Sequence, residues 1–168
     1  KSGNQGGKSG YYISGYTDKN KLYVGEQIYV EYVFYIKKSK LGTNIFRQLV
    51  PPEIHKPNTN FIGFWVKEKL TKQNWKEDGE YIKITIYRGI LTAQKSGELI
   101  LDPALLEFRY KGIETREVSS RPITITVEPL PTPKPTTFFS GVGELKIKVE
   151  LDNNTIKANE AINLEITI

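Results

Sequence analysis

The residues that could carry out chemistry are few in this chain of 168 residues. The sequence contains no cysteine, and His55 is its single histidine. Without cysteine there is no disulfide, thiolate nucleophile or cysteine metal site, and one histidine argues against a Ser-His-Asp triad or a multi-histidine metal site. Aspartates and glutamates are scattered among turns, and no two stand out as an acid/base pair. We therefore expect a protein that is not an enzyme and that uses no cofactor or metal.

Positive charge is concentrated in one irregular, proline-containing stretch, residues 37–60. The net charge is +5, with +6 on residues 1–130 and −1 on residues 131–168. The candidate surface consists of Lys37, Lys38, Lys40, Arg47 and Lys56. Such a loop can attract an acidic partner, although lysines also suppress pairing between sheet edges. No RNA-binding or helix-turn-helix pattern accompanies these residues, so we expect no nucleic-acid partner.

Aromatic side chains are the second candidate for recognition. The tyrosines that cluster early in the chain include Tyr11, Tyr12, Tyr16, Tyr23, Tyr29 and Tyr35. Exposed aromatics can form a sugar-stacking platform or a protein-binding hot spot, whereas buried ones build sandwich cores. We expect Trp65 to pack in the core. Trp75 stands beside Asn74 and Lys76 in a turn-like stretch and is the better surface candidate.

The elements that must position these side chains are β-strands. The chain has 4 alanines against 19 isoleucines, 9 valines, 14 threonines and 10 tyrosines. β-Branched and aromatic residues fit a pleated, half-buried surface, whereas alanine, leucine and methionine favour helices. This composition argues against a helix bundle and against a doubly wound α/β enzyme.

Apolar residues alternate along several segments at the period of two that is typical of strands. In residues 28–35, one face carries Ile28, Val30, Tyr32 and Phe34, and the other carries Tyr29, Glu31, Val33 and Tyr35. In residues 81–92, one face carries Ile82, Ile84 and Ile86, and the other carries Lys83, Thr85 and Tyr87. Such segments recur about every ten residues between Gly or Pro turns. This spacing predicts an all-β fold, an immunoglobulin-like antiparallel β-sandwich.

The chain divides into four expected parts. Residues 1–10 have no apolar side chain and are expected to form a flexible linker. Residues 11–130 are the sandwich. Residues 131–137 belong to a stretch with four prolines in seven residues, which predicts an extended, semi-rigid spacer. Residues 138–168 begin a second immunoglobulin-like domain, which is truncated.

The start of the second domain repeats part of the first. Residues 17–34 align with residues 151–168 at an offset of 134, with five identities in eighteen positions. The identical pairs are Asp18/Asp152, Asn20/Asn154, Glu26/Glu160, Ile28/Ile162 and Glu31/Glu165. Two strands cannot bury a core alone. We therefore expect that the parent chain continues and that the strands of residues 144–168 pair with another surface.

Four motifs, taken in order, resemble those of one known family. They are a turn with the start of a strand, a Gly-Phe-Trp segment, a Ser-Gly hairpin before a proline, and a junction between domains. They read Tyr23-Val24-Gly25-Glu26-Gln27-Ile28; Gly63-Phe64-Trp65-Val66-Lys67-Glu68; Lys95-Ser96-Gly97-Glu98-Leu99-Ile100 with Pro103; and Arg121-Pro122, Pro129-Leu130-Pro131, Phe138 and Gly141-Val142-Gly143-Glu144-Leu145. Residues 11–168 thus resemble a middle domain and the start of the next in BatD proteins, the oxygen-tolerance (aerotolerance) family. Ala93 departs from the family, whose hairpin often carries proline there.

The resemblance implies a periplasmic or otherwise extracytoplasmic protein of the cell envelope, with tandem immunoglobulin-like domains and an inner-membrane anchor outside these residues. The family is encoded alongside von Willebrand A-domain proteins and a MoxR-type AAA ATPase, which are the implied protein partners. No catalytic residue comes with the resemblance. The expected function is a non-enzymatic scaffold or adaptor that mediates protein–protein interaction. The alternative is a glycan-binding β-sandwich that uses exposed aromatics.

Overall fold

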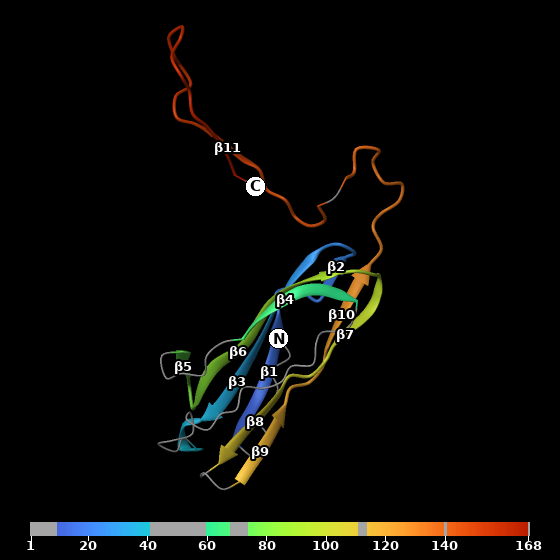
Figure 1. Ribbon diagram of the computed structural model, residues 1–168, viewed down its shortest axis with the longest axis vertical. Coiled ribbons are helices and arrows are strands. Elements are labelled where there is room, and N and C mark those ends of the chain that lie inside the picture. Colours follow the sequence, from blue (N-terminus) through green and yellow to red (C-terminus); the bar gives the residue numbers. More distant parts are fainter. Residues whose placement is uncertain (1–9, 41–59, 68–73, 111–113, 140, 168) are drawn as a thin grey trace.

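The computed structural model describes residues 10–40, 60–67, 74–110, 114–139 and 141–167 (Figure 1). Within these ranges the backbone forms twelve β-strands and one 3-10 turn, η1 (Lys38–Lys40). Two sheets, antiparallel except for the pairing of β2 (Lys21–Tyr23) with β10 (Ile123–Glu128), contribute side chains to one shared hydrophobic core. The prediction of an all-β, immunoglobulin-like antiparallel β-sandwich is confirmed.

The first sheet has five strands, and all its pairings are antiparallel. Its strands are β1 (Tyr11–Thr17), β3 (Gln27–Lys37), β6 (Tyr81–Ala93), β4 (Phe61–Lys67) and β5 (Trp75–Asp78). The order is β1-β3-β6-β4, and β5 pairs with the other end of β6. The long strands β3 and β6 therefore form the centre of the sheet, and β1 forms one edge.

The second sheet has three strands in the order β2-β10-β7. They are β2 (Lys21–Tyr23), β10 (Ile123–Glu128) and β7 (Gly97–Leu101). β10 pairs antiparallel with β7 but parallel with β2. Because β2 lies between β1 and β3 in the sequence, the chain crosses from the first sheet to the second and returns within about ten residues.

The core follows the alternation that the sequence predicts in β3. Ile28, Val30, Tyr32 and Phe34 are each at most 1% exposed. They pack with aliphatic side chains of the second sheet, Leu99, Leu101, Ile125 and Val127. The Tyr32 hydroxyl is also satisfied, because it donates a hydrogen bond to the Asp102 carbonyl at 3.0 Å.

One predicted side-chain direction is wrong, that of Tyr87. The register of β3 and β6 shifts between Tyr32, which faces Tyr87, and Val33, which faces Thr85. Ile86 is therefore an extra residue in β6, as in a β-bulge, and the alternation changes face there. Tyr87 lies in the core cluster with an exposure of 8%, and not on the opposite face from Ile86.

Two hairpins extend the described structure. β8 (Leu105–Tyr110) and β9 (Glu114–Ser119) form one of them, and β9 lies beside β1. The Arg116 guanidinium donates a hydrogen bond to the Tyr11 hydroxyl at 2.8 Å and so ties β9 to β1.

The second hairpin lies after the proline-rich stretch. It consists of β11 (Lys148–Leu151) and β12 (Leu164–Thr167), and all eight strand residues are exposed. Figure 1 shows it in orange and red, beyond the end of the sandwich where β10 finishes. Within the described residues, β11 and β12 pair with each other and with no third strand.

Candidate interaction surfaces

Two lysines of the predicted basic surface are paired with carboxylates. Lys37 Nζ lies 3.0 Å from Glu80 Oε2, and Lys38 Nζ lies 2.6 Å from Glu77 Oε2. The hydrogen bond to Glu80 and the charge of that carboxylate raise the pKa of Lys37. Both carboxylates come from β5 and the turn after it, so the positive charge of this corner is partly compensated.

Of the remaining basic candidates, the structure describes Lys40. Lys40 is in η1, and its Cγ lies 3.1 Å from the position that a Cβ would take at Gly10. Arg47 and Lys56 lie outside the described residues, and so does His55. The basic interaction surface therefore stays a prediction, with part of its charge neutralised at Lys37 and Lys38.

Trp75, the aromatic surface candidate, begins β5 opposite Ile84 of β6. Its indole is only half-buried, but it packs against the hydrophobic core. Trp65 has a similar position in β4, with its ring centroid 5.9 Å from that of Tyr32. Trp75 can therefore offer only part of its ring to a ligand.

A cluster of four tyrosines lies on the face of the first sheet that points away from the core. We call Tyr12, Tyr16, Tyr35 and Tyr81 the tyrosine cluster. The rings of Tyr12 and Tyr35 are stacked with centroids 4.7 Å apart and planes 4° apart. Tyr81 meets both rings edge-on, at 5.5 Å from Tyr12 and 6.5 Å from Tyr35. The sequence shows that tyrosines are frequent early in the chain. It does not show that the register of β1 on β3 places Tyr12 opposite Tyr35.

Two hydroxyl groups of the tyrosine cluster are hydrogen-bonded to each other. The Oη atoms of Tyr16 and Tyr35 are 2.6 Å apart. Burial, and then the hydrogen bond with Tyr16, raise the pKa of Tyr35 far above its ordinary value. Burial also raises the pKa of Tyr12. The cluster is therefore an aromatic surface with hydroxyl groups that can donate or accept, which suits both protein and sugar ligands.

An open cleft of about 490 Å³ is lined by residues of β1, by the loop after it and by residues 121–124. Ile13, Asp18, Lys19, Arg121 and Ile123 are among the residues that line it, so the lining is both aliphatic and charged. The two sheets approach closely at Gly15, because a Cβ there would lie 2.7 Å from Ile123 Cδ1. This cleft is a second candidate surface, beside the tyrosine cluster at the edge strand β1.

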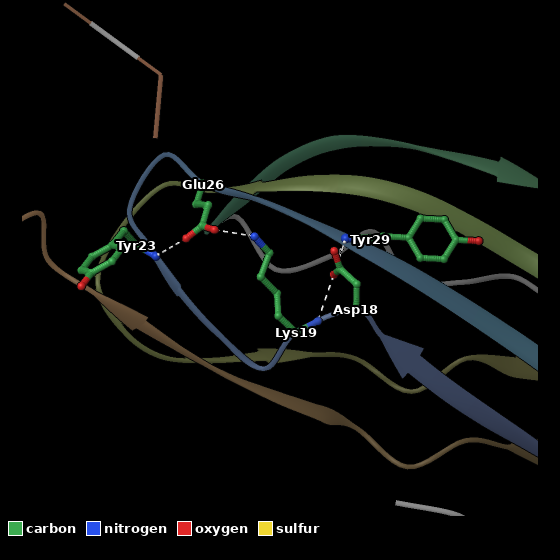
Figure 2. A network of polar contacts seen from close by, with 5 residues as sticks. All are labelled: Asp18, Lys19, Tyr23, Glu26 and Tyr29. Atoms are coloured by element: carbon green, nitrogen blue, oxygen red, sulfur yellow. Dashed lines mark hydrogen bonds and ion pairs between the residues drawn. The ribbon is translucent and has the colours of Figure 1, made fainter. Parts of the chain in front are cut away.

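A network of polar contacts holds the loop that carries β2 (Figure 2). Asp18 Oδ1 accepts hydrogen bonds from the backbone N–H of Lys19 at 3.1 Å and of Tyr29 at 2.9 Å. Glu26 Oε2 accepts one from the backbone N–H of Tyr23 at 2.9 Å, and its other oxygen is paired with Lys19 Nζ. Two carboxylates thus join the start of the loop to its end.

The Glu26 carboxylate is stabilised in its ionised form. Its partial burial acts to raise the pKa, but the hydrogen bonds from Lys19 and from the Tyr23 backbone outweigh it. The pKa of Glu26 is therefore lower than the ordinary value of 4.5. This network has a structural role, since every partner of the two carboxylates belongs to the loop or to the start of β3.

We call the sandwich, residues 11–130, the first unit and residues 138–168 the second unit. The hairpin of the second unit reproduces two of these hydrogen bonds at an offset of 134. Asp152 Oδ1 accepts from the backbone N–H of Asn163 at 3.2 Å, as Asp18 does from Tyr29. Glu160 Oε2 accepts from the backbone N–H of Lys157 at 2.8 Å, as Glu26 does from Tyr23. The repeat in the sequence is thus a repeat of hydrogen bonds.

Backbone conformation and register repeat as well. Gly25 has φ of 87°, and Asn159, at the equivalent position, has φ of 71°. Gly15 faces Tyr32 in the first unit, and Val149 faces Ile166 in the second. The segment equivalent to β2 is not a strand, which follows from the need of β2 for β10 as its neighbour.

The described part of the chain contains neither a cluster of metal ligands nor a membrane-spanning helix. There, no group of three or more His, Cys, Asp or Glu side chains is placed to hold a metal ion. In residues 10–40, 60–67, 74–110, 114–139 and 141–167, no helix is long and apolar enough to cross a membrane.

The fold and these surfaces define the class: an immunoglobulin-like β-sandwich with an aromatic patch and the repeated start of a second unit. No protein-family model matches the sequence, and no curated protein matches it. Among solved structures, the crystal structure of BcpA*(D312A), the major pilin subunit of Bacillus cereus, is similar over 70% of this chain, with 9% identity and a TM-score of 0.43. The similar region spans 40% of that pilin chain.

Proposed function

We propose that this chain is a non-enzymatic scaffold or adaptor module of a BatD-like oxygen-tolerance protein, which mediates protein–protein interaction in the cell envelope. Its parent would be extracytoplasmic and anchored in the membrane outside these residues. The proposal rests on the motifs that resemble the BatD family and on one structural observation, the tyrosine cluster.

The tyrosine cluster supports a protein partner because of its chemistry and its rigidity. Tyrosine is enriched at the energetically important positions of protein interfaces. Here the rings are held by stacking and by the contact between two hydroxyls, so a partner would immobilise few new side chains. Tyr16 is 40% exposed, which leaves a large part of this residue free to be covered.

The partner class follows from the resemblance: a von Willebrand A-domain protein encoded beside the parent gene. Its purified A domain would be titrated against this chain by calorimetry. We expect Tyr16→Ala to weaken binding by about 30-fold or more, since hot-spot residues contribute about 2 kcal/mol or more.

Tyr23→Ala is the matched control, because Tyr23 is 39% exposed but belongs to β2 in the second sheet. Binding should be unchanged by this substitution. No binding by the parent chain, or an equal loss with Tyr16→Ala and Tyr23→Ala, would rule out the tyrosine cluster as the interface.

The alternative function, glycan binding, is favoured by the same aromatic and hydroxyl groups and by the partly exposed Trp75. Aromatic rings can stack on the apolar faces of sugars. Envelope polysaccharides would be titrated while tryptophan fluorescence is followed. A saturable change that disappears in Trp75→Ala supports this alternative, whereas identical titrations of the parent and Trp75→Ala remove Trp75 from it.

A further inference from the structure

One side chain after the proline-rich stretch differs from all its described neighbours. Of residues 131–139 and 141–167, Val142 is the one of intermediate exposure, and all the others are exposed. It precedes the second hairpin by a few residues and lies between Gly141 and Gly143, both of which have positive φ, 84° and 141°. Something in the first unit therefore covers Val142.

The covering surface is the turn between β2 and β3. A Cβ added to Gly25 would lie 3.3 Å from Val142 Cγ2, and one added to Gly143 would lie 3.6 Å from Glu26 Cγ. Val142 therefore fills the space that Gly25 leaves by having no side chain, and Gly143 passes beside the Glu26 side chain.

This turn is rigid because it is bonded on several sides. The Gly25 N–H donates to the Ala93 carbonyl at 2.9 Å, and the Ala93 N–H donates to the Glu26 carbonyl at 3.2 Å. The Glu26 carboxylate is in turn held by Lys19 and by the backbone of Tyr23. We call the space that Gly25 leaves the notch. These hydrogen bonds fix the notch to β6, a central strand of the first sheet.

We infer that Val142 is a latch, which docks in the notch at Gly25 and holds the second unit in a defined orientation on the first. Without such a contact, a proline-rich spacer would leave the two units free to reorient. Gly141 and Gly143 supply backbone conformations that other residues rarely adopt, so Val142 can reach the notch. This inference holds whether or not the tyrosine cluster binds a partner.

The repeat shows why the notch is specific. Asn159 takes the place of Gly25 in the second unit and has the same backbone conformation. A side chain stands there, at the position where the first unit leaves room for Val142. The docking surface is therefore a property of the first unit and is not reproduced by the repeat.

The test measures the distance between the two units in the full chain. The protein has no cysteine, so spin labels can be attached to Lys95→Cys and Thr155→Cys alone, both at exposed positions. Double electron–electron resonance should give one narrow distance distribution. Val142→Ser and Gly25→Ala should each broaden it, because one removes the apolar group and the other fills the notch.

Two substitutions serve as matched controls. Ile147→Ser removes an apolar side chain that is 69% exposed. Gly79→Ala introduces a Cβ at a positive φ of 58° where nothing lies within 4 Å. Neither should broaden the distribution, and thermal unfolding will verify that each variant retains the sandwich. A broad distribution in the parent chain, or one that stays narrow in Val142→Ser, would show that Val142 does not fix the orientation of the second unit.

Discussion

Residues 11–33 of the first unit and the equivalent residues 145–167 of the second share a local structure but not an environment. Strand register, the two carboxylate hydrogen bonds and the positive φ before the glutamate are the same in both. Yet Ile28 is 0% exposed and Ile162 is 42% exposed. The difference arises because β6 and the second sheet cover residues 11–33, while no other sheet in the described part of the chain covers residues 145–167.

This comparison separates the features that neighbouring residues specify from the features that need distant parts of the chain. The turn geometry is specified by the residues of the turn itself, since Asp, Glu and a residue that tolerates positive φ reproduce it without a core. Burial, and the strand conformation of β2, need partners that lie more than 40 residues away in the sequence. An equivalent sequence therefore produces the same loop in both units but a core in one of them.

The largest expected difference is in amide hydrogen exchange. Amides in β3 should exchange mainly by global unfolding, which costs about 5–15 kcal/mol in a typical domain. Amides in β12 belong to a two-stranded hairpin, which is marginal by itself, and they should exchange several orders of magnitude faster. Mass spectrometry of exchanged peptides measures both in one sample. Equal protection of the two strands would show that the second unit is buried against another surface in solution.

The next largest expected difference is between the effects of two isoleucine-to-alanine substitutions at equivalent positions on the free energy of unfolding. Ile28→Ala removes a fully buried side chain and should lower the free energy of unfolding by about 2–5 kcal/mol. Ile162→Ala makes the same chemical change at the equivalent position of the repeat, where the side chain is exposed. It should alter the free energy of unfolding by no more than about 0.5 kcal/mol.

Urea denaturation followed by tryptophan fluorescence reports on the sandwich alone, because Trp65 and Trp75 both pack against its core. The two variants should therefore have well-separated midpoints. If their midpoints shift equally, the second unit contributes to the stability of the first, and the contrast between the units is smaller than the structure indicates.

The aspartates of the two loops give a smaller contrast. Asp18→Ala removes the acceptor of two backbone N–H groups and should destabilise the sandwich by about 1 kcal/mol, the usual contribution of a hydrogen bond. Asp152→Ala removes the acceptor of the backbone N–H and the side-chain amide of Asn163 from the exposed hairpin and should leave the urea midpoint unchanged. A destabilisation by Asp18→Ala that is no larger than that by Asp152→Ala would mean that the loop network does not stabilise the sandwich.

Sequence patterns predicted the features that depend on neighbouring residues. The alternation of Ile28, Val30, Tyr32 and Phe34 follows from a single strand and is confirmed in the structure. The repeat was visible because its polar residues are retained, and its hydrogen bonds follow from them. The all-β fold followed from composition and spacing in the same way.

Features that depend on pairing between distant strands could not be predicted. Tyr87 was assigned to the wrong face because a bulge at Ile86 is decided by the pairing of β3 with β6. The compensation of Lys38 by Glu77 joins residues 39 positions apart. The tyrosine cluster likewise needs the register of β1 on β3 and the position of β6, which the tyrosine count alone does not contain.

The smallest expected effect is a dependence of stability on pH that belongs to Glu26. Its pKa is lowered in the folded protein from an ordinary value of 4.5, so folding favours the ionised form. The stabilisation is complete above pH 4.5, the ordinary value, and is lost as the pH falls through the lower pKa of the folded state. Since Lys19 is partly exposed, the gain should stay below about 1 kcal/mol.

Glu26→Gln should therefore be less stable than the parent at neutral pH and should approach it as the solution is acidified toward pH 3. Urea midpoints measured across this range give the difference directly. Glu160→Gln changes the equivalent residue of the repeat and should follow the parent at every pH, because the unfolding of the sandwich does not involve it. A constant difference between the parent and Glu26→Gln at all pH values would mean that the glutamine lost packing or hydrogen bonding and that the charge of Glu26 contributes nothing.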